Sequence, residues 1–132
     1  MIEYRCFRNN DPPHLAEVWR SADLGPLAMQ PMTTADLEAG VFSKPYFDRR
    51  GLIIAVEGGR IVGFAHAGFG PSADQKSIDT SVGSTLLVIV PPHQAENEIG
   101  NELLARCERY LQESGTTRFL GGGNDVFRGF YL

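Results

Sequence analysis

The residues from Thr85 to Gly100 could bind an anion. Thr85 to Val90 are mostly apolar and typical of a strand, Pro91 and Pro92 end it, and a helical pattern opens at Gly100. The unbonded N–H groups at the start of a helix, together with the positive end of its dipole, point at any negative group placed there. Only one glycine stands in this turn, so an ordinary strand-to-helix connection is the alternative interpretation and the commoner case.

A side chain that could accept a proton is harder to find. His66 lies in the middle of an expected strand among small residues, and Glu57 ends the strand before it. General-base catalysis needs such a group, or a chain of waters, close to the reacting atoms. A histidine in such a strand is more often a hydrogen-bonded structural group, so we assign no general base.

The histidines and cysteines predict no metal site. They show neither metal-ligand spacing nor a partner pattern: His14, His66, His93, Cys6 and Cys107. A secreted scaffold of this size usually has more cysteines, so two reduced thiols in a cytoplasmic protein are the favoured interpretation and one disulfide is the alternative. The N-terminus lacks a signal-peptide h-region, and no apolar run approaches the ~20 residues that a membrane span requires.

Length and charge restrict the class of protein. The 132 residues are enough for a single domain, 1–132. Hydrophobic residues make up 42% and charged residues 21%, as in ordinary globular proteins. The formal net charge is −4, and no cluster of Lys and Arg is present. Nucleic-acid binding is therefore not expected, because neutralising phosphates needs a basic face.

Hydrophobic periodicity predicts the elements that would position these residues. The expected strands are 2–8, 52–56, 61–69, 85–90 and 118–120, and helices begin near Asp11, Thr33, Gly100 and Asn124. Gly58 and Gly59 suit a hairpin turn, because adjacent glycines accept positive φ angles. Residues 70–82 are typical of a loop. The order is β-α-α-β-β-β-α-β-(α), a mixed α/β (α+β) sheet with helices on both faces.

Helix boundaries have their own signals. Asp11 can cap the first helix, Thr33 and Asp36 form a weak capping box, and Gly115 suits the end of the longest helix. In that helix, Glu102 and Arg106 have the spacing of an ion pair. Its expected apolar face consists of Ile99, Leu103, Leu104, Cys107, Tyr110 and Leu111.

The segment Leu86–Tyr110 resembles the GNAT superfamily of acyl-CoA-dependent N-acyltransferases. Val90-Pro91-Pro92 is similar to the V-x-P that ends the fourth strand of that family, and residues 99–104, IGNELL, are similar to the IGxxLL that opens its cofactor helix. The order of elements from residue 2 onward is also similar. The resemblance implies the GNAT fold and a cosubstrate that is acetyl-CoA or another acyl-CoA, with no metal.

The pyrophosphate loop departs from the family's R/Q-x-x-G-x-G/A. In the gapless register Ala95 stands at the Arg/Gln position and Glu98 at the first glycine, while Gln94 would substitute only through an insertion. Glu96 and Glu98 would lie beside a diphosphate, and each like-charge pair would cost on the order of 1–3 kcal/mol. Alternatively, Glu98 simply complements the helix dipole at a site that binds nothing.

The resemblance implies a set of cofactor-binding residues, with main-chain amides between Pro92 and Asn101 facing outward as a cup for diphosphate. The set is Val88, Val90, Gln94, Ala95, Glu96, Asn97, Glu98, Ile99, Gly100, Asn101 and Asn124. The thioester would lie where the strands at 85–90 and 118–121 move apart.

The C-terminal residues carry a second resemblance. Asn124, Phe127, Phe130 and Tyr131 are similar to the family's N-x-x-A-x-x-L-Y, with Phe127 where alanine is usual. The resemblance implies that Tyr131 is the catalytic acid, since a phenol of pKa near 10 is protonated at neutral pH and can supply a thiolate of pKa near 8.5. Alternatively, Phe130 and Tyr131 only pack a terminal helix.

The family adds two strands after this helix, so the resemblance implies a fold that lacks the final strand pair, or the N-terminal part of a longer protein. The strand at 118–121 would then be an exposed edge, which proteins usually cover. A second copy of the chain, as a homodimer, or a second domain would cover it.

The resemblance implies an acyl-CoA-dependent N-acetyltransferase. It would move an acetyl group by direct attack to an unidentified primary amine, on a small molecule or a peptide. No nucleic acid and no membrane is expected as a partner, and the expected location is the cytoplasm. The alternative from another class is a non-catalytic GNAT-like module that binds acyl-CoA or has a structural role.

Overall fold

The structure, a computed structural model, describes residues 1–22, 33–43, 47–71 and 78–120. Its strands form one sheet in chain order: β1 (Ile2–Cys6), β2 (Leu52–Glu57), β3 (Arg60–Pro71), β4 (Ile78–Ile89) and β5 (Arg118–Leu120). The pairs from β1 to β4 are antiparallel, and β4 and β5 are parallel. The predicted order is confirmed up to β5, and the helix expected near Asn124 lies outside the described residues.

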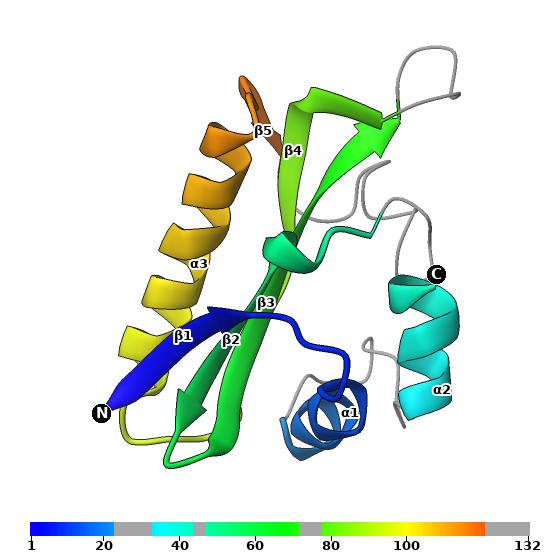
Figure 1. Cartoon of the computed structure of the whole chain (residues 1–132). Coiled ribbons are helices and arrows are strands. Elements are labelled where there is room, and N and C mark those ends of the chain that lie inside the picture. The colour runs from blue at the N-terminus through cyan, green and yellow to red at the C-terminus, as the bar shows by residue number, and fades with distance from the viewer. Residues whose placement is uncertain (23–32, 44–46, 72–77, 121–132) are drawn as a thin grey trace.

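Helices cover both faces of the sheet (Figure 1). One face packs against α1 (Pro12–Ser21), α2 (Thr34–Leu37) and the π-helical turn η1 (Glu38–Phe42), and the other packs against α3 (Glu96–Glu113). β2 is buried on both faces, as its apolar run predicts. Leu52 and Ile54 belong to the core under α1 and α2, whereas Ile53 and Ala55 belong to the core under α3.

Several local predictions are confirmed. Gly58 and Gly59 have φ of 58° and 79°, as a primed hairpin turn requires. Thr33 and Asp36 form a reciprocal capping box, with both hydrogen bonds at 3.1 Å. Gly115 ends α3 with φ of 93°. These turns needed no tertiary information, because each depends only on backbone conformation within four residues.

Three expectations about boundaries and faces are wrong. Residues 70–82 are not all loop, because β3 runs to Pro71 and β4 begins at Ile78. The long hairpin extends these strands through Gly70, Pro71 and Asp79, which have low strand propensity. α3 begins at Glu96 rather than Gly100, since its first turn is polar and lacks the apolar period. Leu104 is 39% exposed, while the other residues of the predicted apolar face are buried.

Asp11 holds the start of α1 to β1 instead of capping the helix. It stands at the N-cap position, but its carboxylate accepts hydrogen bonds from both terminal nitrogens of Arg5 at 2.8 Å and from the Arg8 N–H at 2.7 Å. Asp11 is 2% exposed. Burial alone would raise the pKa of this carboxyl, but the hydrogen bonds from Arg5 and Arg8 bring the pKa below its usual value.

Replacing Asp11 by asparagine should lower the free energy of unfolding by about 2–3 kcal/mol at pH 7, because the half-buried Arg5 loses its charged partner. A depressed carboxyl pKa contributes stability above the unfolded pKa of about 4, and this contribution is lost as the pH falls through the lower folded pKa. Urea unfolding should therefore show a smaller difference in free energy of unfolding between the wild type and Asp11→Asn at pH 3 than at pH 7.

The matched control is Glu102→Gln, which breaks the more exposed pair with Arg106 at 2.8 Å. It should cost only about 0.3–0.5 kcal/mol. Equal losses of unfolding free energy in the two variants would show that the Arg5–Asp11 pair contributes no more stability than the more exposed pair.

Candidate functional site

The first turn of α3 leaves main-chain donors open. The first helical hydrogen bond runs from the Ile99 N–H to the Ala95 carbonyl at 2.9 Å, so the four preceding N–H groups need other acceptors. The Ala95 N–H donates to Nδ1 of His93 at 2.9 Å, and the Glu96 N–H donates to the His93 carbonyl at 3.0 Å. Within the described part of the chain, the N–H groups of Asn97 and Glu98 have no acceptor.

The expected cup of amides is therefore partly closed: two of its donors bond His93, and two remain available at the positive end of an 18-residue helix. The predicted side chains around it divide by exposure. Those of Gln94, Glu96, Asn97, Glu98 and Asn101 are exposed, whereas Ala95 and Gly100 are half-buried. Ile99 is fully buried in the core under α3.

The acidic side chains of the first turn do not fill the cup. Glu96 and Glu98 are both exposed to solvent. At a helix N-terminus each carboxylate stabilises the helix by about 0.3–1 kcal/mol, and the same charge opposes an anion bound to the neighbouring amides. The main-chain donors thus fit a diphosphate, and the charges of Glu96 and Glu98 would weaken its binding.

His93 links this turn to the end of β2. Its Nε2 lies 3.0 Å from Oε1 of Glu57, and its side chain is 17% exposed. Because Nδ1 accepts the Ala95 N–H, the ring proton is assigned to Nε2, which donates to the carboxylate. From the sequence, His93 was considered only as a metal ligand. Its partner is 36 residues away in the chain, and no local pattern signals such a contact.

The edge of β4 beyond Ser84 is the second component of the site. The β4–β5 pairing ends at Ser84–Leu120, and among the described residues Thr85 to Ile89 pair only with β3. Leu86 is an extra residue between the pairs His66–Leu87 and Ala67–Thr85, which makes a β-bulge.

Side chains along this edge differ in environment. Val88 is 37% exposed and lies opposite Ala65, on the face of the sheet that α3 covers. Val90 is half-buried and packs beside the same core. Within the described residues, the buried hydroxyl of Ser84 has no hydrogen-bond partner. A buried group left unsatisfied costs about 1–3 kcal/mol.

His66 is a core group. It is 1% exposed, and burial lowers its pKa to about 3, so the ring is neutral at pH 7. Its ring packs edge-on against Phe47, with centroids 5.6 Å apart. This environment agrees with the structural interpretation of His66, and Glu57 is engaged with His93. No general base is assigned from these two residues.

The other predictions concern the C-terminal residues, the two cysteines, metal binding and membrane spans. Asn124, Phe127, Phe130 and Tyr131 lie outside the described residues. Cys6 is exposed and Cys107 is buried, both as free thiols, and burial raises the pKa of Cys107 to about 12. In the described ranges, no group of three or more His, Cys, Asp and Glu side chains could hold a metal ion. No helix there is long and apolar enough to cross a membrane.

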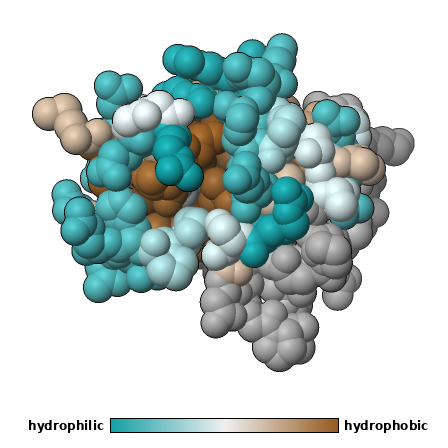
Figure 2. All heavy atoms as spheres, turned by 90° about the horizontal axis from the view of Figure 1, so that it is seen from below, coloured by the Kyte–Doolittle hydropathy of each residue, from teal (hydrophilic) through white to brown (hydrophobic). Residues whose placement is uncertain are grey.

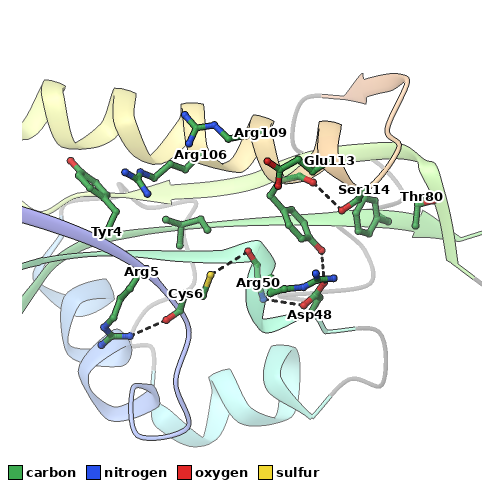
Figure 3. Close-up of a pocket in the computed structure, with 13 residues that line it drawn as sticks. Tyr4, Arg5, Cys6, Asp48, Arg50, Thr80, Arg106, Arg109, Glu113 and Ser114 are labelled. Atoms are coloured by element: carbon green, nitrogen blue, oxygen red, sulfur yellow. Dashed lines mark hydrogen bonds and ion pairs between the residues drawn. The ribbon is translucent and has the colours of Figure 1, made fainter.

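A separate groove of about 610 Å³ lies between β1, the 3₁₀ turn η2 (Arg49–Gly51) and the C-terminal half of α3 (Figure 3). In it the Tyr110 hydroxyl donates to Asp48 at 2.8 Å, and the Arg106 guanidinium stacks over the Tyr4 ring at 4.7 Å. Of the arginines that line it, Arg5, Arg50 and Arg106 each pair with a carboxylate. The Arg106–Tyr4 contact holds α3 against β1, and the Tyr110–Asp48 bond holds it against the residue before η2.

The end of the molecule that holds the β2–β3 hairpin and the start of α3 is shown from below in Figure 2. Apolar side chains form the floor of a hollow there, ringed by hydrophilic ones. A groove of about 510 Å³ at this end lies between α1, the hairpin and the turn before α3, and His93 is one of its lining residues.

In the described part of the chain, a mixed sheet lies between two helical layers, two N–H groups at the start of α3 lack acceptors and β4 is paired on one side only beyond Ser84. This arrangement agrees with the fold that the resemblance implies. A model of the Acetyltransferase (GNAT) family matches residues 11–131. The chain therefore belongs to the GNAT acetyltransferase family. A search of curated proteins finds no match.

Solved structures share the fold at low sequence identity. A GNAT family acetyltransferase from Brucella melitensis, in complex with acetyl-CoA, aligns with a TM-score of 0.73 and 15% identity over 94% of this chain and 77% of its own. A transcriptional regulator from Bacillus halodurans C-125 aligns with a TM-score of 0.67 and 19% identity, over 94% of this chain and 83% of its own. Aminoglycoside N-acetyltransferase AAC(6')-Iy in complex with CoA aligns with a TM-score of 0.67 and 18% identity, over 94% of this chain and 78% of its own.

Glu98→Gln should strengthen the binding of acetyl-CoA about threefold to tenfold, because an exposed like charge near a diphosphate costs on the order of 1 kcal/mol. Isothermal titration calorimetry would measure the gain, which should shrink as salt screens the charge. Glu108→Gln, exposed on the same helix but far from its first turn, is the control. Unchanged affinity in Glu98→Gln would place the diphosphate elsewhere.

Proposed function

We propose that the protein is an acyl-CoA-dependent N-acetyltransferase that transfers an acetyl group from acetyl-CoA to a primary amine. The observation that supports this most is the pair of N–H groups at Asn97 and Glu98, which have no acceptor among the described residues, in a chain of the GNAT acetyltransferase family. Acetyl-CoA supplies the activated acyl group; the residues of this chain bind and orient it.

The binding residues follow from the donors available. The diphosphate would accept hydrogen bonds from the Asn97 and Glu98 N–H groups, at the positive end of the α3 dipole. The pantetheine arm contains amides. Among the described residues, Thr85 to Ile89 pair only with β3, so their other edge offers matching donors and acceptors, as a strand edge does to an added peptide. Val88 and Val90 would contact the arm.

The transfer needs one nucleophile and one acid. The amine nitrogen attacks the thioester carbonyl carbon, so that a C–N bond forms and the C–S bond breaks. Tyr131 gives its phenol proton to the departing sulfur and regains one from water, while the proton of the amine leaves to water. Holding both reactants in line would provide most of the acceleration. We assign the acceptor as a small molecule or a peptide with a primary amine.

The surroundings of the protein are also proposed. β5 pairs with β4 through three residues and has no second strand partner among the described residues, so we propose that a second copy or a second domain covers it. Two unpaired cysteines suit the reducing cytoplasm. Neither nucleic acid nor membrane is proposed as a partner.

A second candidate function is a non-catalytic module that binds acyl-CoA. The exposed carboxylates of Glu96 and Glu98 beside the open amides favour it, because they weaken cosubstrate binding. Acetyl-CoA titration combined with thiol release in the presence of an amine panel separates the two. Turnover supports the enzyme, binding without turnover supports the module, and lack of binding contradicts both.

Tyr131→Phe should lower kcat at least about a hundredfold while the KM for acetyl-CoA stays unchanged, since the variant loses a proton donor and no binding group. Steady-state thiol release measures both constants. The control is Tyr4→Phe, whose ring can still stack under Arg106 in the separate groove. Equal kcat in Tyr131→Phe and the wild type would remove Tyr131 from the mechanism.

A further inference from the structure

One residue accepts both of the first two amides of the α3 turn. His93 accepts the Ala95 N–H with its ring and the Glu96 N–H with its carbonyl. We propose that His93 is a positioning residue that fixes the N–H groups of Asn97 and Glu98 toward the diphosphate of CoA. The inference rests on the proposed function, because it concerns the same cosubstrate.

The N-cap residue of α3 explains why another residue has to accept hydrogen bonds in this turn. Ser, Thr, Asp or Asn at an N-cap takes the N–H group of the second or third helical residue with its side chain. In α3 those residues are Asn97 and Glu98, and the N-cap is Ala95, which has no side-chain acceptor. Alanine therefore leaves these two donors open, and His93 satisfies the two that precede them.

The far side of the His93 ring is also held. Nε2 donates to Glu57, the last residue of β2, at 3.0 Å. Both ring nitrogens are thereby engaged, which fixes the tautomer and the orientation of the ring. The turn before α3 is thus tied to the end of the sheet at the hairpin. The two open N–H groups keep one direction before a ligand arrives, which lowers the entropic cost of binding.

The test uses calorimetry with three probes: CoA, inorganic diphosphate and pantetheine, which lacks the diphosphate. His93→Ala should weaken the binding of CoA and of diphosphate about tenfold and leave the binding of pantetheine unchanged. His93→Asn should bind within about threefold of wild type, because its side-chain oxygen can accept the same N–H two residues on. His14→Ala, an exposed histidine that lines the same groove, is the control.

Ala95→Ser is the complementary variant and stays informative should His93→Ala fail to fold. Its hydroxyl would cap the helix by taking an N–H of Asn97 or Glu98. The melting temperature should therefore rise, while CoA and diphosphate bind about tenfold more weakly. A residue needed only for folding would not separate stability from binding in this way.

Four results would overturn the proposal: tighter or equal CoA binding in His93→Ala, equal weakening in His93→Ala and His93→Asn, an equal loss for pantetheine, or no loss in Ala95→Ser. The proposed function fails separately. Wild type that binds diphosphate through His93 but binds no CoA would contradict the acetyltransferase and retain the positioning role. Wild type that binds neither probe would overturn both.

Discussion

The N–H groups of Asn97 and Glu98, for which neither α3 nor His93 supplies an acceptor, are the constraint on which the site depends. Every helix leaves its first N–H groups without helical acceptors, and a protein must bond them, solvate them or use them. Here His93 accepts the N–H groups of Ala95 and Glu96, and among the described residues those of Asn97 and Glu98 remain without an acceptor. The chemistry proposed for the chain follows from these donors and the strand edge beside them.

The cores hold these groups in place. Ile99 and Leu103 of α3 are fully buried against β2 and β3, which fixes the helix over the sheet. Gly63 allows the close packing at the start of α3, because a Cβ there would lie 3.1 Å from the Ile89 carbonyl and 3.3 Å from the Ile99 side chain. At Gly100 a Cβ would meet only Val90, at 3.9 Å, so packing does not require that glycine.

Sequence reasoning was accurate where one local rule decides the outcome. The glycine pair of the hairpin and the Thr33–Asp36 box depend on neighbours within four residues. The apolar face of α3 follows from helical spacing, although Leu104, at the margin of that face, is exposed.

Contacts between distant residues were beyond the sequence. Asp11 has the residue type and position of a helix cap, yet its carboxylate binds Arg5, a stronger charged partner supplied by β1. The first turn of α3 and the link from His93 to Glu57 were missed because polar turns carry no apolar period and ring-to-amide bonds leave no pattern. The resemblance identified the region of the site, and only the structure shows which donors are open.

Electrostatics sets the strength of this arrangement. The dipole of α3 favours an anion at its start, while Glu96 and Glu98 supply two charges that oppose one. Binding of a diphosphate there depends on whether fixed main-chain donors outweigh exposed carboxylates, which salt and water screen. Main-chain donors have the advantage of not needing to reorganise.

The most direct test is a titration of ¹⁵N-labelled protein with CoA, followed through its amide resonances. We expect the resonances of Asn97 and Glu98 to shift the most, to saturate together, and not to move with pantetheine. Shifts concentrated around Arg109 and Tyr110, with Asn97 and Glu98 unmoved, would contradict this expectation.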